Sequence, residues 1–496
     1  MSHVTRQISR RSMLKAAGAA AGATGIGTAA IPTPAAAAGA YAHPGLLHTR
    51  TDLARMAAKV KAGAAPYTAG FAKLTANRHS QSGWTANPQA TVIRGGEGQN
   101  YATLYNDIHA AYQNALRGHI SGDDAHLDTA VAILNAWSAK LTALGGNADR
   151  FLAAGLYGYQ FANAAELVRD HPDFELARSQ EMLSSVFASV SDDFLVRHNG
   201  AVISNYWTNW DLTAMCCVLA GGLFCDDKAQ VARAVEYFKH GEGLGSIKNA
   251  IPVVYDDGLA EWLEAGRDQG HALLGVGLMG TFCEMAWNQG IDLYGYDDNR
   301  FFKGAQYVAK WSMGGDVPYT ANTRAKGAIN GWSGSETVTE AAPVDPASTR
   351  PIWAMIANHY TKRRGMSASY LTQIAAKSAP EGGGGDYGPN SGGFDQLGFG
   401  TLAFTRDRSE DTSASPSPSA TASPSASTST PAAGSDPQPQ GSAGSATPSA
   451  SPASDGDLAA TGSNEVVGWT AAAGVAAVAG GVLFMRRRDQ VRRESQ

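Results

Sequence analysis

From His43 to about Tyr370 the chain repeats a pattern that is typical of helices, with leucine, alanine and aromatic residues recurring at intervals of three and four. Glycine, asparagine, aspartate and proline interrupt this pattern and indicate where helices end. Few stretches before Tyr319 alternate in the manner of a strand. The predicted helices span residues 51–62, 103–116, 124–143, 150–170, 176–190, 209–224, 227–241 and 273–288.

So many paired helices of moderate length predict an all-α domain built of helical hairpins, an α/α toroid. A small β element is expected after Gly331 or within 382–404, where glycine-rich sequence ends in an apolar stretch. The 496 residues and 44% hydrophobic content would allow two or three domains on length alone. The composition of the two ends reduces this to one folded domain, predicted at 41–407.

The first 40 residues have the pattern of a signal peptide. Residues 9–15 read Ser-Arg-Arg-Ser-Met-Leu-Lys and precede an alanine- and glycine-rich run that continues to Ala30. A basic start with a twin arginine, followed by a weakly apolar segment, is typical of export through the Tat translocon. We expect cleavage near Ala38 or Ala40.

The C-terminal end carries three further segments in order. Residues 408–457 are rich in Ser, Pro, Ala and Thr, a composition that predicts a disordered tether. The stretch Leu458-Ala-Ala-Thr461-Gly462 resembles the sorting signal of sortase-anchored Gram-positive proteins, and it opens the last segment, 458–496. An apolar run of spanning length, 466–485, follows and ends in arginines. The resemblance implies cleavage after Thr461 and attachment to peptidoglycan at the cell surface; a plain single-span anchor is the alternative.

The net charge and the placement of the cysteines argue against a nucleic-acid-binding protein and against a zinc site. The formal net charge of −5 argues against a broadly basic surface for nucleic acid. Four cysteines lie in apolar surroundings without CxxC spacing, which favours buried thiols over a zinc site. In an oxidising location, the formation of one disulfide, from Cys216 or Cys217 to Cys225 or Cys283, is an alternative. No cofactor is expected; 297–299, Asp-Asp-Asn, could hold calcium, although such a run is more often a solvated turn.

Residues 256–271 form the densest polar cluster of the chain. If one helix continues from Leu259, then Glu264, Arg267 and His271 share a face. The following run, 272–285, is mostly apolar and glycine-rich, so it is expected to pack closely and to place His271 at the mouth of a pocket. The alternative is a solvated helix face with a salt bridge.

A second geometry is open for the same stretch. If Gly266 and Gly270 break the helix, Asp268 becomes an N-cap and His271 lies in the first turn of the next helix. Both geometries bring His271 and Arg267 into a shared space.

Aromatic, amide and charged residues gather at the ends of a few predicted helices, as in 204–211, which reads Ser-Asn-Tyr-Trp-Thr-Asn-Trp-Asp. Aromatic planes and hydrogen-bonding groups are what a sugar-binding groove needs, because sugar rings stack on aromatic faces and hydroxyls take hydrogen bonds. A place in the core is the alternative for the tryptophans. The candidates for contacts with a glycan are Tyr206, Trp207, Trp210, Trp262, Glu264, Gln269 and Tyr296.

These motifs resemble those of the alginate-lyase-like polysaccharide lyases, over about two thirds of the chain. The resemblance implies an α/α toroid with a cleft at one end and β-elimination on uronate polymers, hence an acidic polysaccharide as substrate. The motifs that carry it are 205–210, 264–271, Asp316-Val-Pro-Tyr319, Arg350-Pro-Ile-Trp353 and 358–360.

β-Elimination independently requires these residue types. The carboxylate beside the acidic proton must be neutralised, a base must take the C5 proton, and an acid must protonate the departing O4. We assign carboxylate binding to Asn209 and Arg267, the base to His271 and the acid to Tyr319. The rival tyrosines are Tyr206, Tyr294, Tyr296 and Tyr360.

The sequence departs from the better-known alginate lyases at one point. They carry a histidine directly after an asparagine in the motif that ends in Tyr-Trp, whereas here Asn205 runs straight into Tyr206. Either His271 replaces that histidine, with His359 in reserve, or the chain is a divergent branch that acts on another uronate such as glucuronan.

Two other function classes stay open. A glycoside hydrolase on a similar toroid would need two carboxylates. A non-catalytic glycan-binding protein displayed on the wall would need none. The carboxylates available to a hydrolase are Asp256, Asp257, Glu261 and Glu264.

Overall fold

The computed structural model describes residues 41–327 and 333–408. The predicted signal peptide, residues 409–457 of the predicted tether 408–457, the sorting signal with Leu458, Thr461 and Gly462, and the apolar run 466–485 lie outside the described residues. Among the helices of 41–327 and 333–408, none is both long and apolar enough to cross a membrane.

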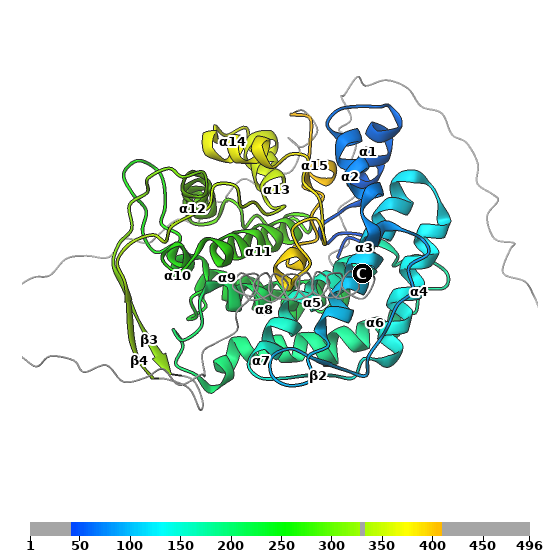
Figure 1. The fold of residues 1–496 in the computed structure, drawn as a ribbon, viewed down its shortest axis with the longest axis horizontal. Coiled ribbons are helices and arrows are strands. Elements are labelled where there is room, and N and C mark those ends of the chain that lie inside the picture. The colour runs from blue at the N-terminus through cyan, green and yellow to red at the C-terminus, as the bar shows by residue number, and fades with distance from the viewer. Residues whose placement is uncertain (1–40, 328–332, 409–496) are drawn as a thin grey trace, which may run out of the picture. The chain divides into compact units, whose positions relative to one another are not determined.

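Four long helices form an inner layer, and each contributes many residues to the core (Figure 1). Almost every residue of α8 and α11 is buried, as expected for helices that are apolar on all sides. The inner helices are α3 (Tyr101–Ser121), α5 (Asp149–Leu167), α8 (Thr208–Phe224) and α11 (Gln269–Trp287).

The closest pair of inner helices, α5 and α8, meets through glycines. A Cβ atom at Gly155 would collide with the backbone of Thr213, and one at Gly158 would collide with the Cys217 sulfur. The two contacts advance in the same direction along both helices, so α5 and α8 run parallel. Glycine at these positions lets the helix axes approach more closely than larger side chains would allow.

The other inner helices follow the same direction. The Cys216 thiol on α8 donates to the carbonyl of Leu278 on α11, 3.2 Å away. Near the end of α3, His119 Nε2 lies 2.6 Å from the carbonyl of Leu167, the last residue of α5. All four helices therefore begin at one end of the layer and finish at the other. Their N-termini, which carry partial positive charge, therefore lie together at the end of the layer where the helices begin.

Outer helices return antiparallel beside the inner ones and complete the hairpins. Trp137, late in α4, donates to Asp107, early in α3, whereas Leu127 packs on Gly118. Likewise Tyr237, late in α9, donates to Asp211, early in α8. This is an incomplete α/α toroid, and the predicted all-α fold is confirmed. The outer helices are α4 (Asp124–Lys140), α6 (Leu176–Met182), α7 (Ser189–Arg197), α9 (Lys228–His240) and α12 (Tyr296–Ser312).

Shorter helices cover the ends of the layers. The α-helices among them are α1 (Arg50–Lys61), α2 (Tyr67–Ala76), α10 (Ile247–Ala250), α13 (Trp353–Asn358), α14 (Ser369–Ser378) and α15 (Gly400–Ala403). The 3₁₀ segments are η1 (Arg78–Ser80), η3 (His198–Gly200), η4 (Leu263–Gly266) and η6 (Ser391–Phe394), and the π segments are η2 (Leu183–Ala188) and η5 (His359–Arg363).

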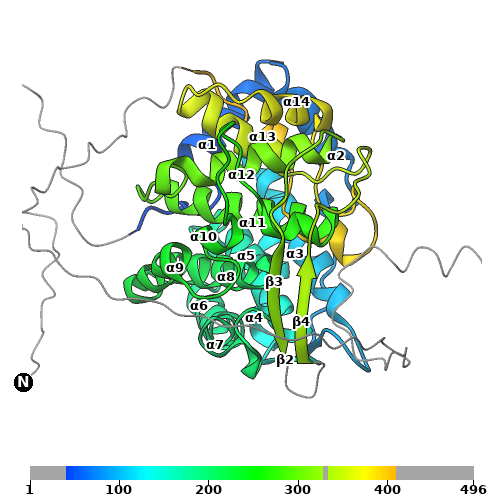
Figure 2. The same cartoon turned by 90° about the vertical axis from the view of Figure 1, so that its left-hand side faces the viewer.

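Two small sheets accompany the helices. Strands β1 (Thr91–Ile93) and β2 (Ala143–Gly145) pair in parallel, with Val92 opposite Leu144. Because 143–145 is a strand, α4 ends before the predicted limit of 143. Strands β3 (Asn322–Gly327) and β4 (Ser333–Val338) form an antiparallel hairpin along one side of the helices (Figure 2). This hairpin is the expected small β element, whereas 382–404 contributes one isolated bridge, Gly383 with Gly398.

The glycine-rich segment 381–404 fills the space inside the ring of helices. Phe394 stacks on Tyr105 of α3 with ring centroids 4.4 Å apart, and its carbonyl accepts from His109 and Gln160. Tyr159 of α5 donates to the carbonyl of Asp395. The segment therefore joins α3 and α5 and fills the space enclosed by the inner helices.

The cysteines form no disulfide. Cys216, Cys217 and Cys283 are buried free thiols, and Cys225 is a half-buried free thiol. The interpretation as buried thiols therefore fits three of the four, and Cys225 is partly exposed.

Glu381 should make stability depend on pH. Its buried carboxyl accepts hydrogen bonds from the backbone of Trp353 and Ala354 at the start of α13, and burial raises its pKa to about 7. Between the unfolded pKa near 4.5 and the folded value, the native state keeps a proton that the unfolded state has lost. Stability should therefore be greatest below that window and fall by roughly 3 kcal/mol as the pH rises through it.

Chemical denaturation of wild type and Glu381→Gln at about pH 5 and about pH 8 measures this effect. Glu381→Gln should remove most of the decline, because glutamine stays neutral in both states. Glu97→Gln, at an exposed position, is the control and should retain it. An unchanged decline in Glu381→Gln would contradict the assignment.

Candidate active site

The predicted polar cluster is built around a break between two helices. Segment η4 ends at Gly266 and α11 begins at Gln269, with Asp268 as its N-cap. The Asp268 side chain accepts from the backbone N–H of His271, at 2.8 Å, as an N-cap does. The second of the two predicted geometries is therefore the observed one, and His271 lies in the first turn of α11.

His271 is held between a carboxylate and a guanidinium. Its Nδ1 lies 2.7 Å from Asp268 Oδ2, and its Nε2 lies 3.3 Å from Arg267 Nη2. If Nδ1 donates to Asp268, then Nε2 is the acceptor on the side of Arg267. Burial alone would raise the pKa of Asp268, but the hydrogen bonds from His271 and the charge of Arg267 outweigh it and lower the pKa to about 2.

The buried carboxylate of Glu264 holds the guanidinium of Arg267 in place. The Glu264 side chain is fully buried and accepts from the Thr208 hydroxyl, from the backbone and side-chain amides of Asn209, and from Arg267 Nη1 at 3.1 Å. One carboxylate therefore joins the N-terminus of α8 to the loop before α11. Because Glu264 has no exposed surface, it positions other groups and does not meet a glycan directly.

Asn209 belongs to the same buried network. It has no exposed surface, and its side-chain amide donates to Glu264, while its Oδ1 has no hydrogen-bond partner in the described part of the chain. The predicted direct contact between Asn209 and a substrate carboxylate is not available in this structure. Its observed contact is with the residue that holds Arg267.

Tyr319 reaches the cluster from the segment after α12. Its hydroxyl donates to the carbonyl of Leu263, at 2.9 Å, and its ring packs over Gly266. Burial raises the pKa of Tyr319, and the charge of Glu261 raises it further. A phenol in this setting keeps its proton at neutral pH, as a general acid must.

Trp207 is the glycan-contact candidate that packs against a charged group. The guanidinium carbon of Arg324 lies 4.2 Å from the centre of its ring. Arg324, on β3, also binds the carbonyls of Ser204 and Asn205 and pairs with Glu336 on β4. The β3–β4 hairpin is thus fastened to the loop before α8. Nothing in the spacing of the sequence marked Arg324.

Trp207 is itself only 8% exposed, and three further aromatic candidates are buried as well. The rings of Tyr206 and Trp210 contact each other at a tilt of 42°, with centroids 4.5 Å apart, and both pack on Phe194 and are buried. Trp262 is completely buried. These three rings fit the alternative interpretation of a place in the core, because none presents a face to a sugar.

Gln269 and Tyr296 are also occupied elsewhere. Gln269 exchanges hydrogen bonds with the backbone of Asp345, at 2.9 and 3.2 Å. Tyr296 packs on Phe238, which stacks on Phe282 of α11. Phe282 is eleven residues beyond His271, which corresponds to roughly 16 Å along the helix.

The reserve histidine lies at the far end of α11. His359 stacks on Tyr294 with centroids 3.6 Å apart and meets Trp287 edge-on. Burial, strengthened by Arg363, lowers the pKa of His359 well below its ordinary value. His359 and the buried Tyr294 and Tyr360 are therefore not brought to the site of His271.

The carboxylates considered for hydrolysis do not form an open pair. Glu261 is buried and accepts from the Tyr255 hydroxyl and the Thr320 amide, both at 2.5 Å. Glu264 is enclosed in the network described above. Asp256 and Asp257 lie on an exposed turn, where Asp257 accepts from a nearby backbone amide.

The acids of 297–299 are paired with cations. Asp297 binds Arg300 and lies 3.6 Å from Lys248, and Asp298 binds Lys303 at 2.7 Å. Among the described residues, no group of three or more His, Cys, Asp or Glu side chains is arranged to hold a metal ion.

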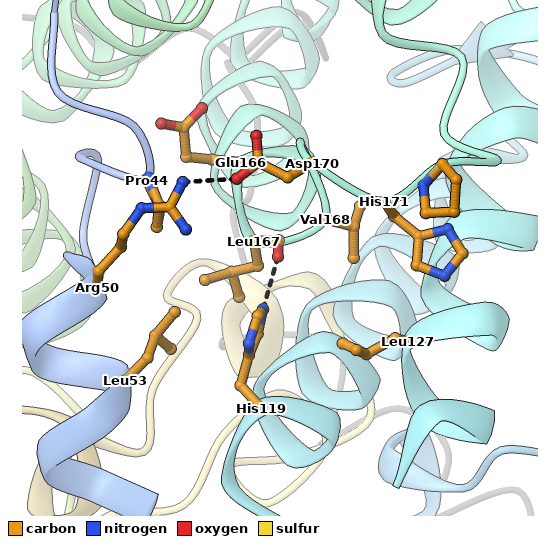
Figure 3. Close-up of a pocket in the computed structure, with 11 residues that line it drawn as sticks. Pro44, Arg50, Leu53, His119, Leu127, Glu166, Leu167, Val168, Asp170 and His171 are labelled. Atoms are coloured by element: carbon orange, nitrogen blue, oxygen red, sulfur yellow. Dashed lines mark hydrogen bonds and ion pairs between the residues drawn. The ribbon is translucent and has the colours of Figure 1, made fainter. Parts of the chain in front are cut away.

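A cavity of about 420 Å³ opens at the opposite end of the inner helices (Figure 3). Arg50, His119 and Asp170 line it, together with apolar residues such as Leu53 and Leu127. It lies where α3 and α5 finish, whereas His271 lies where α11 begins. This cavity and the cluster around His271 are therefore separate.

Residues 78–317 match the family model described as alginate lyase. The matched range is somewhat less than half of the 496 residues, includes Asn209, Arg267 and His271, and ends two positions before Tyr319. The match supports the alginate-lyase-like resemblance that the sequence motifs indicated. No curated protein matches the chain.

Solved alginate lyases are among the similar structures. Alginate lyase A1-III from Sphingomonas species A1 is 14% identical, with a TM-score of 0.45, covering 67% of this chain and 92% of its own. An alginate lyase from Bacteroides ovatus is 14% identical, with a TM-score of 0.37, covering 54% and 82%. A variant of alginate lyase A1-III complexed with a tetrasaccharide is 13% identical, with a TM-score of 0.45, covering 72% and 94%.

Gly266→Ala should displace Tyr319. An added Cβ would overlap the phenol ring and Val338, so we expect a loss of about 1–3 kcal/mol in the free energy of unfolding. Gly270→Ala, four residues later, is the matched control. Its nearest neighbour would be Asp268 Oδ1 at 3.4 Å, so it should stay within about 1 kcal/mol of wild type. Denaturant titration compares the two, and equal effects would contradict the packing described.

Proposed function

We propose that this protein is a polysaccharide lyase that cleaves a uronate-containing polymer, alginate or a related polyuronate, by β-elimination. We further propose that it leaves the cell through the Tat pathway and is anchored to peptidoglycan by sortase. The family match over 78–317 supports the lyase class. The export and anchoring proposals rest on the sequence of 9–15 and of 458–462.

The observation that carries the lyase proposal is the contact between His271 and Arg267. In a uronate the C5 proton and the carboxylate are attached to the same carbon atom. The base that takes the proton and the cation that binds the carboxylate must therefore lie next to each other. Nε2 of His271 lies 3.3 Å from Nη2 of Arg267. Arg267 would neutralise the carboxylate and stabilise the developing enolate while His271 takes the proton.

Asp268 and Glu264 supply the orientation that this chemistry needs. Asp268 holds Nδ1 of His271 and so turns Nε2 toward Arg267, in the manner of the third member of a catalytic triad. Glu264 fixes the guanidinium from its buried side. Asn209 is assigned a positioning role, because it meets Glu264 and has no exposed surface.

Tyr319 is the proposed general acid for the departing O4. Its raised pKa keeps the phenol protonated, and its hydroxyl lies against η4, directly before Arg267. To act, the hydroxyl must exchange its hydrogen bond with Leu263 for one with the glycosidic oxygen. That exchange costs little because one hydrogen bond replaces another.

The surrounding field suits an anionic polymer. The N-termini of α8 and α11 adjoin the cluster. Arg267 lies in it, paired with Glu264 and Asp268, and Arg324, paired with Glu336, lies over the ring of Trp207. Helix N-termini and guanidinium groups both favour bound carboxylates.

Ultraviolet absorbance tests the proposal, because elimination leaves a conjugated unsaturated uronate and hydrolysis does not. The purified full chain is mixed with alginate, polyguluronate, polymannuronate and glucuronan. Wild type should raise the absorbance with at least one polymer. His271→Ala should lower kcat by about 10²–10⁴-fold, as expected for loss of a general base.

His171→Ala is the control, because His171 also pairs with an aspartate, Asp128 at 3.3 Å, but lies at the other end of the helices. It should keep wild-type activity. A flat trace with every polymer, or full activity in His271→Ala, would refute the proposed function.

Asp268→Asn should separate orientation from folding. Asparagine is also a good N-cap, so the start of α11 should be kept, and loss of the partly exposed carboxylate should lower the free energy of unfolding near neutral pH by roughly 1–2 kcal/mol. The rate should nevertheless fall by roughly 10²-fold or more, because the carboxylate that orients His271 is lost. Rates and denaturation curves on the same preparation distinguish the two, and an active Asp268→Asn variant would contradict the assigned role.

A further inference from the structure

The backbone on either side of Tyr319 is fixed by hydrogen bonds from two different elements. Before it, the carbonyl of Pro318 accepts from the hydroxyl of Tyr307 on α12, at 2.7 Å. After it, the amide of Thr320 donates to Oε2 of Glu261, at 2.5 Å. The direction in which the Tyr319 side chain leaves the backbone therefore depends on these two contacts.

Glu261 is a rigid partner for this backbone. Only 1% of the residue is exposed. Its own amide donates to the carbonyl of Val253, at 2.8 Å, and the amide of Ala260 donates to the carbonyl of Lys303 on α12, at 3.2 Å. The hydroxyl of Tyr255 donates to the same Oε2 of Glu261, at 2.5 Å. Because a buried carboxylate is stable only where donors satisfy it, these bonds confine the carboxylate to one position.

Glu261 also acts on the phenol of Tyr319 through its charge. Burial raises the pKa of Tyr319, and the negative charge of Glu261 raises it further, because a phenolate beside a carboxylate is repelled. Burial likewise raises the pKa of Tyr307, and burial together with the hydrogen bond to Glu261 raises the pKa of Tyr255 to about 12, so both neighbouring phenols are neutral. The phenol form of Tyr319 is therefore favoured, and it can give a proton but is a poor base.

The other charged groups around Tyr319 are paired with each other. Beside η4, against which the Tyr319 hydroxyl packs, Glu264 lies 3.1 Å from Arg267. On the neighbouring strand β4, Glu336 pairs with Arg324. Opposite charges in such pairs largely cancel at a distance. In the described part of the chain, the charge that acts most strongly on Tyr319 is therefore the carboxylate that also holds its backbone.

We propose that Glu261 is a positioning residue that holds Tyr319, through the amide of Thr320, as the proton donor of the elimination. The inference rests on the proposed function and assigns the group that makes Tyr319 an acid and not a base. In the step itself, the C5 proton passes to Nε2 of His271, the C5–H electron pair forms the C4–C5 double bond, and the C4–O4 bond breaks. O4 leaves with the proton of Tyr319. The imidazolium and the tyrosinate then return to their starting forms through water, so no proton is gained or lost overall.

Two substitutions separate the position of Tyr319 from its protonation state. Glu261→Gln keeps an oxygen acceptor for the amide of Thr320 and removes the charge. Glu261→Asp keeps the charge but is one methylene shorter, so it should lose the hydrogen bond to that amide. A residue with a purely structural role would not distinguish the two variants by their pH dependence.

Nuclear magnetic resonance of the full chain, labelled with ¹³C at the phenol carbon of tyrosine, tests the charge effect without relying on turnover. Tyr319→Phe identifies the Tyr319 signal by its loss. In Glu261→Gln, Tyr319 should titrate at lower pH than in wild type, and in Glu261→Asp at nearly the wild-type pH. Glu381→Gln is the matched control, since Glu381 is also a buried carboxylate that accepts backbone amides. It should leave the titration of Tyr319 unchanged.

Rates measured against pH with a polyuronate that wild type cleaves test the consequence for the reaction. Because the acid must be protonated, kcat should fall above the pKa of Tyr319. Glu261→Gln should therefore move this alkaline decline to lower pH and leave KM within about twofold. Glu261→Asp should keep the decline at the wild-type pH but lower kcat by about 10–10²-fold, because the phenol is displaced.

An unchanged titration of Tyr319 and an unchanged alkaline decline in Glu261→Gln would overturn the inference, as would equal effects of Glu381→Gln. Full kcat in Glu261→Asp would overturn it as well, because the contact with Thr320 would then have no effect on the rate. If circular dichroism shows that Glu261→Gln does not fold, this kcat comparison decides.

The titration also separates this inference from the proposed function. A wild type that cleaves no polyuronate, but in which Glu261→Gln still shifts the titration of Tyr319, would refute the proposed function and leave the link between Glu261 and Tyr319 standing. Lyase activity in wild type with no shift in Glu261→Gln would support the proposed function and overturn the role of Glu261.

Discussion

The buried carboxylate of Glu264 is the constraint on which the site depends. It accepts hydrogen bonds from the first turn of α8 and from Arg267, so it joins two inner helices at the end where both begin. A buried carboxylate is costly unless its hydrogen bonds are satisfied, and here hydroxyl, amide and guanidinium donors satisfy it. The position of Arg267, and through it the contact with His271, follows from that network.

The parallel direction of the inner helices explains why the candidate site lies at one end. Each helix presents its N-terminal amides to the same side, and the segment 381–404 fills the bore behind them. The opposite end collects helix C-termini and contains the cavity lined by Arg50 and Asp170. A chain that binds anions is expected to bind them at the end where the inner helices begin, because the helix dipoles favour negative charge there.

The sequence indicated the helices well because their apolar periodicity is a local property. It also placed His271 and Arg267 together, and it included the N-cap at Asp268 as one of two geometries. It could not choose between them, since that choice depends on how Gly266 packs under Tyr319 from a distant segment.

Exposure was the property that local patterns predicted least well. Trp262, Trp210 and Tyr206 have the composition of a sugar groove but are buried, the last two against Phe194 of the preceding helix α7. Arg324 lies in no motif, and its contacts become apparent only where the β3–β4 hairpin meets Trp207. Such contacts join residues that are too far apart in sequence for spacing to reveal them.

Mass spectrometry of the products tests the central claim most directly. A purified uronate hexasaccharide is incubated with the protein in water enriched in ¹⁸O, and the masses of the two fragments are added. Elimination should give fragments whose masses sum to that of the substrate, with a double bond in one of them and no heavy oxygen from cleavage. Fragments that together gain one labelled water would show hydrolysis and contradict the account.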